Sequence, residues 1–193
     1  YIIKIMIKVG ITGASGMIGW HLRAYLEMKG LSEIKIATRE TFQSKSNLLS
    51  FVKNIDVIFH LASQCRGDDL IKINSKIDRS LLDAIEEVSS TPHIIFASSN
   101  HINISKSSTY ARSKILSTNY FENWASKKGI RFTNVIIPHV FGENGKPFHN
   151  SVIATFSYQL ARGEKITLLV DKKLELVHAQ KLADRFYEIA LKS

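Results

Sequence analysis

The chain alternates short apolar runs rich in β-branched residues with amphipathic segments of helical length. Because successive strands are separated by helices, the pattern predicts parallel βαβ units, with helices covering both faces of one sheet. We therefore expect an α/β fold, a Rossmann-like doubly wound parallel sheet. The strands expected to be buried are 7–12, 34–37, 57–61, 93–97 and 133–137.

Beyond about Phe141 the pattern weakens, and Gly, Pro and Asn accumulate, which indicates a smaller lobe or long loops. We expect a dinucleotide-binding Rossmann-like domain over 6–140, with Met6 as the natural start. A small, truncated C-terminal substrate lobe is expected over 141–193, within the same globular unit. The helices expected are 18–28, closed by Gly30, then 73–88, 110–127 and 151–161, and the lobe is expected to hold a strand over 165–169.

The formal net charge of +9 would fit nucleic acid, a membrane surface or an anionic small ligand as a partner. The basic residues occur in ones and twos, with no arm or block, which disfavours a nucleic-acid binder. The apolar opening is too short to span a bilayer. A single cysteine, Cys65, excludes an intrachain disulfide, and the scattered histidines predict no metal site. We expect a cytoplasmic protein that binds neither nucleic acid nor membrane.

Three glycines, Gly13, Gly16 and Gly19, stand between the first expected strand and the first expected helix. Glycines at such a turn let a pyrophosphate approach the N–H groups of the helix N-terminus. The spacing differs from the G-x-G-x-x-G fingerprint. Its position after a strand favours a nucleotide site over a merely structural turn.

The second expected strand ends at Thr38 and Arg39, with Glu40 following. An acidic residue near this point meets the ribose hydroxyls of NAD, whereas an arginine accommodates the 2′-phosphate of NADP. We interpret Arg39 as a phosphate ligand, which favours NADP(H) over NAD(H). The alternative is a solvated loop arginine.

Tyr110 and Lys114 lie four residues apart, so on a helix they face the same way. The pair is either a surface accident or a proton donor with a cation beside it. A cation near a tyrosine favours the phenolate and lowers the pKa of the side chain. We therefore expect Tyr110 to have a lowered pKa and to act as an acid or base.

Four motifs in the right order resemble the extended short-chain dehydrogenase/reductase family of sugar-nucleotide epimerases, dehydratases and reductases. TGASGMIG resembles the dinucleotide loop, VIFHLAS the third main strand, and Asn74 falls where the family has a helix asparagine. IIFASSN followed by YARSK resembles the Ser-Tyr-Lys active site, with Ser99 rather than Ser98 aligned. Segment 142–164 is most similar to capsule and O-antigen reductases that act on a UDP-activated 4-keto-6-deoxy amino sugar.

The resemblance implies an NADP-dependent reductase of the 4-keto group of a nucleotide-activated sugar, in polysaccharide precursor synthesis. Tyr110 would exchange a proton with the substrate oxygen, Ser99 would hydrogen-bond that oxygen, and Lys114 would hold the nicotinamide ribose. Lys146 would contact the diphosphate, or is equally a solvated loop lysine. The expected cofactor contacts are Gly13, Ser15, Gly16, Met17, Ile18, Gly19, Thr38, Arg39, Leu61, Ala62, Ser63, Asn74, Tyr110, Lys114, Pro138 and Val140. The expected substrate contacts are Ser99, Asn100, His139, Lys146, His149 and Asn150.

Two departures weaken the substrate assignment. Gln180 and Lys181 replace acids of the family's late V-H-V-D-D pattern, and the chain is shorter than a typical extended member. The alternatives are an epimerase or dehydratase that keeps NAD(P) bound, and a non-catalytic NADP-binding sensor. The resemblance also implies a homodimer formed through the helices 73–88 and 110–127, with candidate contacts at Leu81, Leu82, Ile85, Leu116, Tyr120 and Trp124.

Overall fold

The computed structural model describes residues 7–31, 33–168, 171 and 173–192, so Met6 lies outside the described residues. Five parallel strands form the main sheet in the order β2-β1-β3-β4-β5. Their bounds are β1 (Val9–Thr12), β2 (Ile34–Ala37), β3 (Val57–His60), β4 (His93–Ala97) and β5 (Phe132–Val135). The predicted doubly wound parallel sheet is confirmed.

The three central strands are buried along their whole length, which explains their apolar, β-branched sequences. Their register brings the carboxyl ends together, since Thr12 pairs with both Ala37 and His60. The chain therefore leaves β1, β2, β3 and β4 at one edge of the sheet. The strand order reverses between β1 and β3, and ligands of open α/β sheets bind beside such a point.

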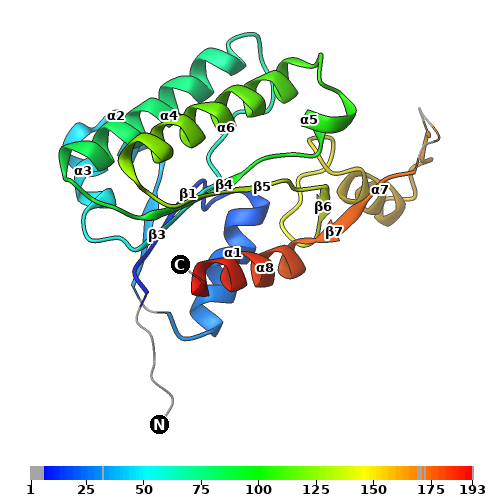
Figure 1. Ribbon diagram of the computed structural model, residues 1–193. Helices are drawn as coiled ribbons and strands as arrows, with labels where there is room; N and C mark the ends of the chain where they lie inside the picture. The colour runs from blue at the N-terminus through cyan, green and yellow to red at the C-terminus, as the bar shows by residue number, and fades with distance from the viewer. Residues whose placement is uncertain (1–6, 32, 169–170, 172, 193) are drawn as a thin grey trace.

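Helices cover both faces of the sheet (Figure 1). α1 (Met17–Met28) and α8 (Ala179–Leu191) pack together on one face, where Phe186 of α8 contacts Phe59 of β3. α2 (Arg39–Gln43), α3 (Lys45–Val52), α4 (Leu70–Glu87) and α6 (Thr109–Lys128) lie over the other face. Each face has its own apolar core. The predicted helices 18–28, 73–88 and 110–127 correspond to α1, α4 and α6, and Gly30 follows α1 with φ +82°.

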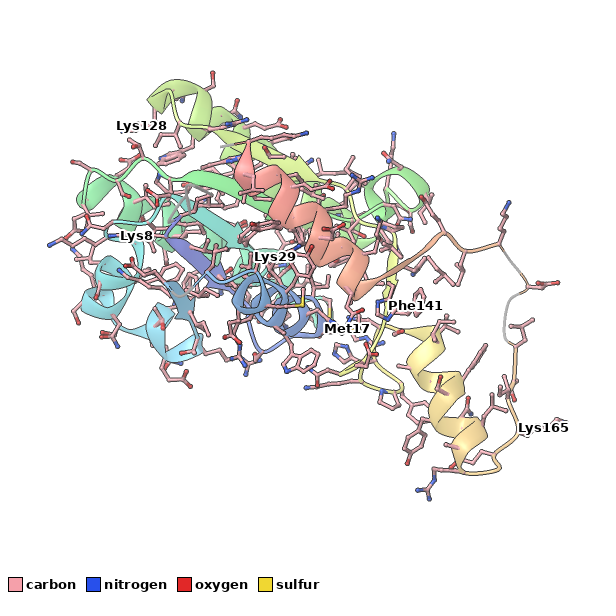
Figure 2. All side chains as sticks on the ribbon, turned by 90° about the horizontal axis from the view of Figure 1, so that it is seen from below. Lys8, Met17, Lys29, Lys128, Phe141 and Lys165 are labelled. Carbon is pink, nitrogen blue, oxygen red and sulfur yellow. The ribbon has the colours of Figure 1, made fainter. Side chains whose placement is uncertain are left out.

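Four smaller elements complete the chain. α5 (His101–Ile104) follows β4, while β6 (His139–Phe141) and β7 (Leu176–His178) form a separate parallel pair. α7 (Val152–Ala161) is the helix expected over 151–161, and Ser151 caps it. Figure 2 shows α7 and the segment near Lys165 at one end of the molecule, apart from the helices that cover the sheet.

The prediction of a lobe strand over 165–169 is wrong for residues 165–168, which have no regular structure, while Leu169 lies outside the described residues. The lobe strand is instead β7, and it pairs with β6 near the sheet. The sequence analysis did not predict α2, α3, α5, β6 or β7, which are short, nor α8, although α8 is amphipathic over 13 residues. A boundary near residue 140 stays a prediction.

Most of the residues proposed as dimer contacts are buried in the core of the protein. Leu81, Leu82, Ile85 and Trp124 are buried against the sheet, so they are not available to a partner. Leu116 and Tyr120 of α6 are exposed, and a homodimer through this face stays a prediction. Among the described residues, no helix combines the length and apolar character needed to cross a bilayer.

Candidate active site

A cavity of about 680 Å³ lies at the carboxyl ends of the strands, between the sheet and the lobe. Most of the predicted site residues line it. They are Gly13, Ser15, Gly16, Met17, Ile18, Gly19, Leu61, Ser63, Ser99, Asn100, Tyr110, Lys114, Pro138, His139, Val140, Lys146, His149 and Asn150. Four predicted cofactor residues are not among the lining residues: Thr38, Arg39, Ala62 and Asn74.

The glycine loop forms one end of the cavity and requires glycine at two positions. Gly13 has φ +72°, and a Cβ there would lie 2.8 Å from the backbone nitrogen of Ala62. A Cβ on Gly19 would meet the carbonyl oxygen of Gly13 and lie 2.6 Å from Ala14 Cα, so loop and helix touch directly. No side chain caps the N-terminus of α1 at Gly16. The first-turn N–H groups of α1 are therefore suited to bind an anion.

Thr38 and Arg39 lie beyond this end of the cavity. Thr38 caps α2, because its hydroxyl accepts a hydrogen bond from the Thr41 N–H and its own N–H donates to the Thr41 hydroxyl. Arg39 is the first residue of α2 and is exposed. The structure places it at the tip of β2, where the sequence predicted it, but outside the cavity wall.

Asn74 of α4 supports the wall instead of forming it. Its carboxamide oxygen accepts a hydrogen bond from the Gln64 N–H at 2.7 Å, and its nitrogen donates to the Gln64 carbonyl and the Ser113 hydroxyl, both at 2.9 Å. The loop that follows β3 is thereby tied to α6. Asn74 thus positions lining residues such as Ser63 and Cys65 without lining the cavity itself.

The Ser-Tyr-Lys residues come together at the middle of the cavity. Ser99 follows β4 directly, and Tyr110 and Lys114 lie one turn apart on α6, whose N-terminus Ser108 caps. The ammonium of Lys114 donates to the carbonyl oxygen of Ala97 at 2.7 Å and lies 5.9 Å from the centre of the Tyr110 ring. Lys114 is only 4% exposed, so its charge is held inside the protein.

Burial governs the titration of this pair. It raises the pKa of Tyr110 above its ordinary value, opposed by a hydrogen bond with Ser99, so the expectation of a lowered pKa is wrong for this structure. Burial also lowers the pKa of Lys114, to about 8. Asp78 opposes that second shift. At neutral pH the site therefore holds a protonated phenol beside a mostly charged amine.

Ser98, beside the aligned Ser99, also lines the cavity. It is 4% exposed, and its hydroxyl has no hydrogen-bond partner among the described residues. A buried hydroxyl without a partner is costly unless a ligand satisfies it. Sequence reasoning treated Ser98 only as the alternative to Ser99, although two adjacent serines at a strand end suggested that both could face one ligand.

The lobe and the loop after β3 form the other end of the cavity. The Asn150 side-chain nitrogen lies 2.9 Å from the sulfur of Cys65, and the His101 ring contacts Tyr110 and His139 at 5.8 and 5.5 Å between centroids. Sequence reasoning missed His101 as a wall residue because it sits on the one-turn helix α5. The other lining residues that it did not assign are Cys65, Ala97, Ser105, Ser108, Ile137, Asn144, Gly145 and Ser151.

The wall carries positive and neutral groups only. Among the described lining residues none is Asp or Glu, whereas Lys114, Lys146 and three histidines are present. No group of three or more His, Cys, Asp or Glu among the described residues is arranged to hold a metal ion. The cavity thus suits an elongated anionic ligand whose phosphates lie at the glycine loop.

A Rossmann-like sheet with a glycine loop and a Ser-Tyr-Lys set at its carboxyl edge defines a nucleotide-binding α/β protein. The chain matches the NAD dependent epimerase/dehydratase family over residues 9–192, and it belongs to that family.

Two relatives are similar to the chain at the level of sequence. It is 31% identical over 158 residues to UDP-2-acetamido-2,6-beta-L-arabino-hexul-4-ose reductase of Pseudomonas aeruginosa, a match that covers 80% of this chain and 41% of the reductase. The crystal structure of the capsular polysaccharide assembling protein CapF from Staphylococcus aureus matches with a TM-score of 0.77 and 27% identity, covering 96% of this chain and 49% of CapF. The chain therefore spans less than half the length of both relatives.

The fold is shared more widely. UDP-N-acetylglucosamine 4-epimerase from Bacillus cereus matches with a TM-score of 0.79 at 22% identity, covering 97% of this chain and 72% of the epimerase. At that identity the likeness shows the fold alone.

Proposed function

We propose that the protein is an NADP-dependent reductase of the 4-keto group of a nucleotide-activated sugar, acting in polysaccharide precursor synthesis. One observation carries the proposal: the glycine loop and the residues Ser99, Tyr110 and Lys114 all line the same cavity. Similarity to the Pseudomonas UDP-hexulose 4-reductase supports the reaction class, and similarity to CapF, a capsular polysaccharide assembling protein, supports the polysaccharide context.

The residues fit a dinucleotide. Gly13 and Gly19 keep the loop free of Cβ atoms, α1 offers uncapped N–H groups, and the buried Ser98 hydroxyl lacks a partner among the described residues. The glycine loop, Leu61, Ser63 and Lys114 would hold the cofactor, with Arg39 at the adenosine 2′-phosphate. When bound, NADPH supplies the hydride that a ketone reduction needs.

The chain's own residues supply the proton. A phenol with a raised pKa is protonated at neutral pH, so Tyr110 can donate its proton to the carbonyl oxygen as that oxygen gains negative charge. The Ser99 hydroxyl donates a hydrogen bond to the same oxygen. The ammonium of Lys114 then stabilises the phenolate left behind, and it is charged below its pKa of about 8.

Net consumption of NADPH distinguishes this proposal from its alternatives. Purified protein is mixed with NADPH and the keto-sugar nucleotide named for the Pseudomonas enzyme, and cofactor oxidation and product are followed together. Stoichiometric NADPH oxidation with formation of the alcohol supports the reductase. Conversion of the sugar with no net loss of a bound cofactor indicates an epimerase instead. Cofactor binding with no conversion of any keto-sugar nucleotide indicates the non-catalytic sensor.

The preference for NADP depends on Arg39 and can be tested separately. We expect NADPH to bind more tightly than NADH, and Arg39→Ala to weaken NADPH binding about tenfold while leaving NADH binding unchanged, because a charge-assisted phosphate contact contributes roughly 1.5 kcal/mol. Fluorescence titration measures both affinities. Arg79→Ala, an exposed arginine on α4, is the matched control. Equal losses for both cofactors would remove the role given to Arg39.

A further inference from the structure

A buried polar chain links β1, β3, α4 and α6 beneath the cavity. The Thr12 hydroxyl lies 2.9 Å from Nδ1 of His60, and Nε2 of His60 lies 3.0 Å from Oδ1 of Asp78. The Ser117 hydroxyl of α6 donates to Oδ2 of Asp78. All four side chains are at most 6% exposed, so water does not compete for these bonds.

The hydrogen bonds of Thr12 fix the protonation of His60. The Thr12 hydroxyl oxygen accepts from the Leu61 and Ala62 N–H groups at 3.1 and 3.0 Å, which occupies both of its lone pairs. Its own proton must therefore go to Nδ1 of His60, and the ring proton lies on Nε2, where it is donated to Asp78. His60 is thus neutral, and it leaves the negative charge of Asp78 uncompensated.

Lys114 lies close to this chain of side chains, because its ammonium is 4.7 Å from the centre of the Phe96 ring and the His60 ring stacks on Phe96 at 5.8 Å between centroids. It precedes Ser117 by three residues on α6, and α6 packs along α4, which carries Asp78. We propose that Asp78, held by His60 and Ser117, is a positioning residue that keeps Lys114 charged inside the cavity wall and fixes α6 against the loop after β3. The catalytic consequence of this pair rests on the proposed function, whereas the pair itself does not.

The surroundings of Lys114 support this role. Burial lowers the pKa of Lys114 to about 8, and the charge of Asp78 acts in the opposite direction. The remaining groups near the amine are the Cys65 thiol, the Tyr110 ring and the Phe96 ring, and the ammonium also donates to the Ala97 carbonyl. Of these, Cys65 and Tyr110 would add negative charge only when ionised, whereas the carboxylate of Asp78 acts on Lys114 in every step of the proposed reaction.

Asp78→Asn tests the proposal, because the amide keeps the shape of the carboxylate and can still accept from His60. The ionisation of Lys114 is read from the ¹³Cε shift in lysine-labelled protein, and Lys114→Arg assigns the signal. We expect the midpoint to fall by roughly one pH unit in Asp78→Asn, since that is the lower range for losing a close opposite charge. Asp83→Asn, an exposed carboxylate on the same helix, and Cys65→Ser should leave the midpoint within a fraction of that shift.

A folded Asp78→Asn protein with an unchanged Lys114 midpoint would overturn the proposal. If the variant does not fold, the wild type carries the test: the ¹³Cγ shift of Asp78 must show a second inflection at the Lys114 midpoint, and a flat trace there overturns the proposal equally. If the protein is the proposed enzyme, the alkaline limb of the kcat-against-pH profile should lie at lower pH in Asp78→Asn than in the wild type, with KM little changed. A shifted Lys114 midpoint in a protein that binds no NADPH would support the role given to Asp78 while removing the proposed function.

Discussion

The two sides of the cavity are built differently. On the sheet side, buried partners fix the polar groups: the Ala97 carbonyl holds Lys114, and Gln64 and Ser113 hold Asn74. On the lobe side, α7 has no buried residue, and Lys146, His149 and Asn150 are exposed. Under the proposed function, the residues proposed for the chemistry lie on the rigid side, and the residues proposed to contact the sugar lie on the thinly packed side.

This difference predicts which substitutions are costly. A group whose geometry depends on buried neighbours should lose much of its effect when altered, whereas a group on an exposed loop should tolerate change. Four substitutions, in decreasing order of expected effect, test the contrast.

Tyr110→Phe should have the largest effect. Loss of a proton donor in the transition state typically costs on the order of 10³-fold in turnover. The phenol is not needed to hold the cofactor's phosphates, so NADPH affinity should change by less than about threefold. Steady-state turnover assays and fluorescence titration measure the two quantities, and Tyr120→Phe, on the exposed side of α6, is the control. Unchanged turnover in Tyr110→Phe would remove Tyr110 as the proton donor.

Gly19→Ala should destabilise the fold by about 3 kcal/mol of unfolding free energy, the upper range for overpacking. The added Cβ would collide with backbone atoms of Gly13 and Ala14, which cannot move without displacing the loop. Gly16→Ala is the matched control, because the nearest atom to its Cβ would be 3.4 Å away, an ordinary contact. Urea unfolding measures both proteins. Equal unfolding free energies for Gly19→Ala and Gly16→Ala would show that the glycine loop tolerates substitution as well as the lobe does.

The sequence predicted the sheet side well for a physical reason. Buried strands must be apolar and helices that cover a sheet must be amphipathic, so β1, β3, β4, α1, α4 and α6 leave a periodic pattern. The glycine loop and Ser99 follow strand ends, and Tyr110 and Lys114 have the spacing of one helix face and resemble the family's active site, which is why these residues could be predicted. Their assignment to the chemistry stays a proposal.

The lobe and the buried polar chain left no such pattern. β6 and β7 are three residues each and are only partly buried, so their pairing depends on contacts distant in sequence. His60 reads as an ordinary strand-end histidine until Thr12 and Asp78 are placed beside it. The lowered pKa expected for Tyr110 failed likewise, because burial depends on the assembled fold and the sequence shows only the adjacent lysine.

His93 extends the comparison to pH. Burial, followed by the charge of Arg131, lowers its pKa to about 4 from 6.5, so the unfolded chain binds more protons between these values. Stability should therefore be full above pH 6.5 and fall by about 3 kcal/mol as the pH drops toward 4, where the loss levels off. His93→Asn should flatten this slope, and His149→Gln, on the exposed lobe, should not. Urea unfolding midpoints measured across this pH range test the prediction. The same dependence of stability on pH in the wild type and both variants would show that His93 is not the group responsible.

Leu160→Gln should have the smallest effect. Leu160 on α7 is 65% exposed, so the polar side chain removes little buried apolar surface, and the unfolding free energy should change by less than about 0.5 kcal/mol. Leu82 lies on the buried face of α4 and is 1% exposed, so Leu82→Gln should lower the unfolding free energy by at least about 3 kcal/mol. A large loss from Leu160→Gln would mean that α7 packs against something in the intact protein, and the lobe would then be as firmly built as the sheet. An unchanged unfolding free energy in Leu160→Gln would show that the lobe surface can change in sequence without loss of stability. Under the proposed function, such a surface could differ between proteins that bind different sugar nucleotides.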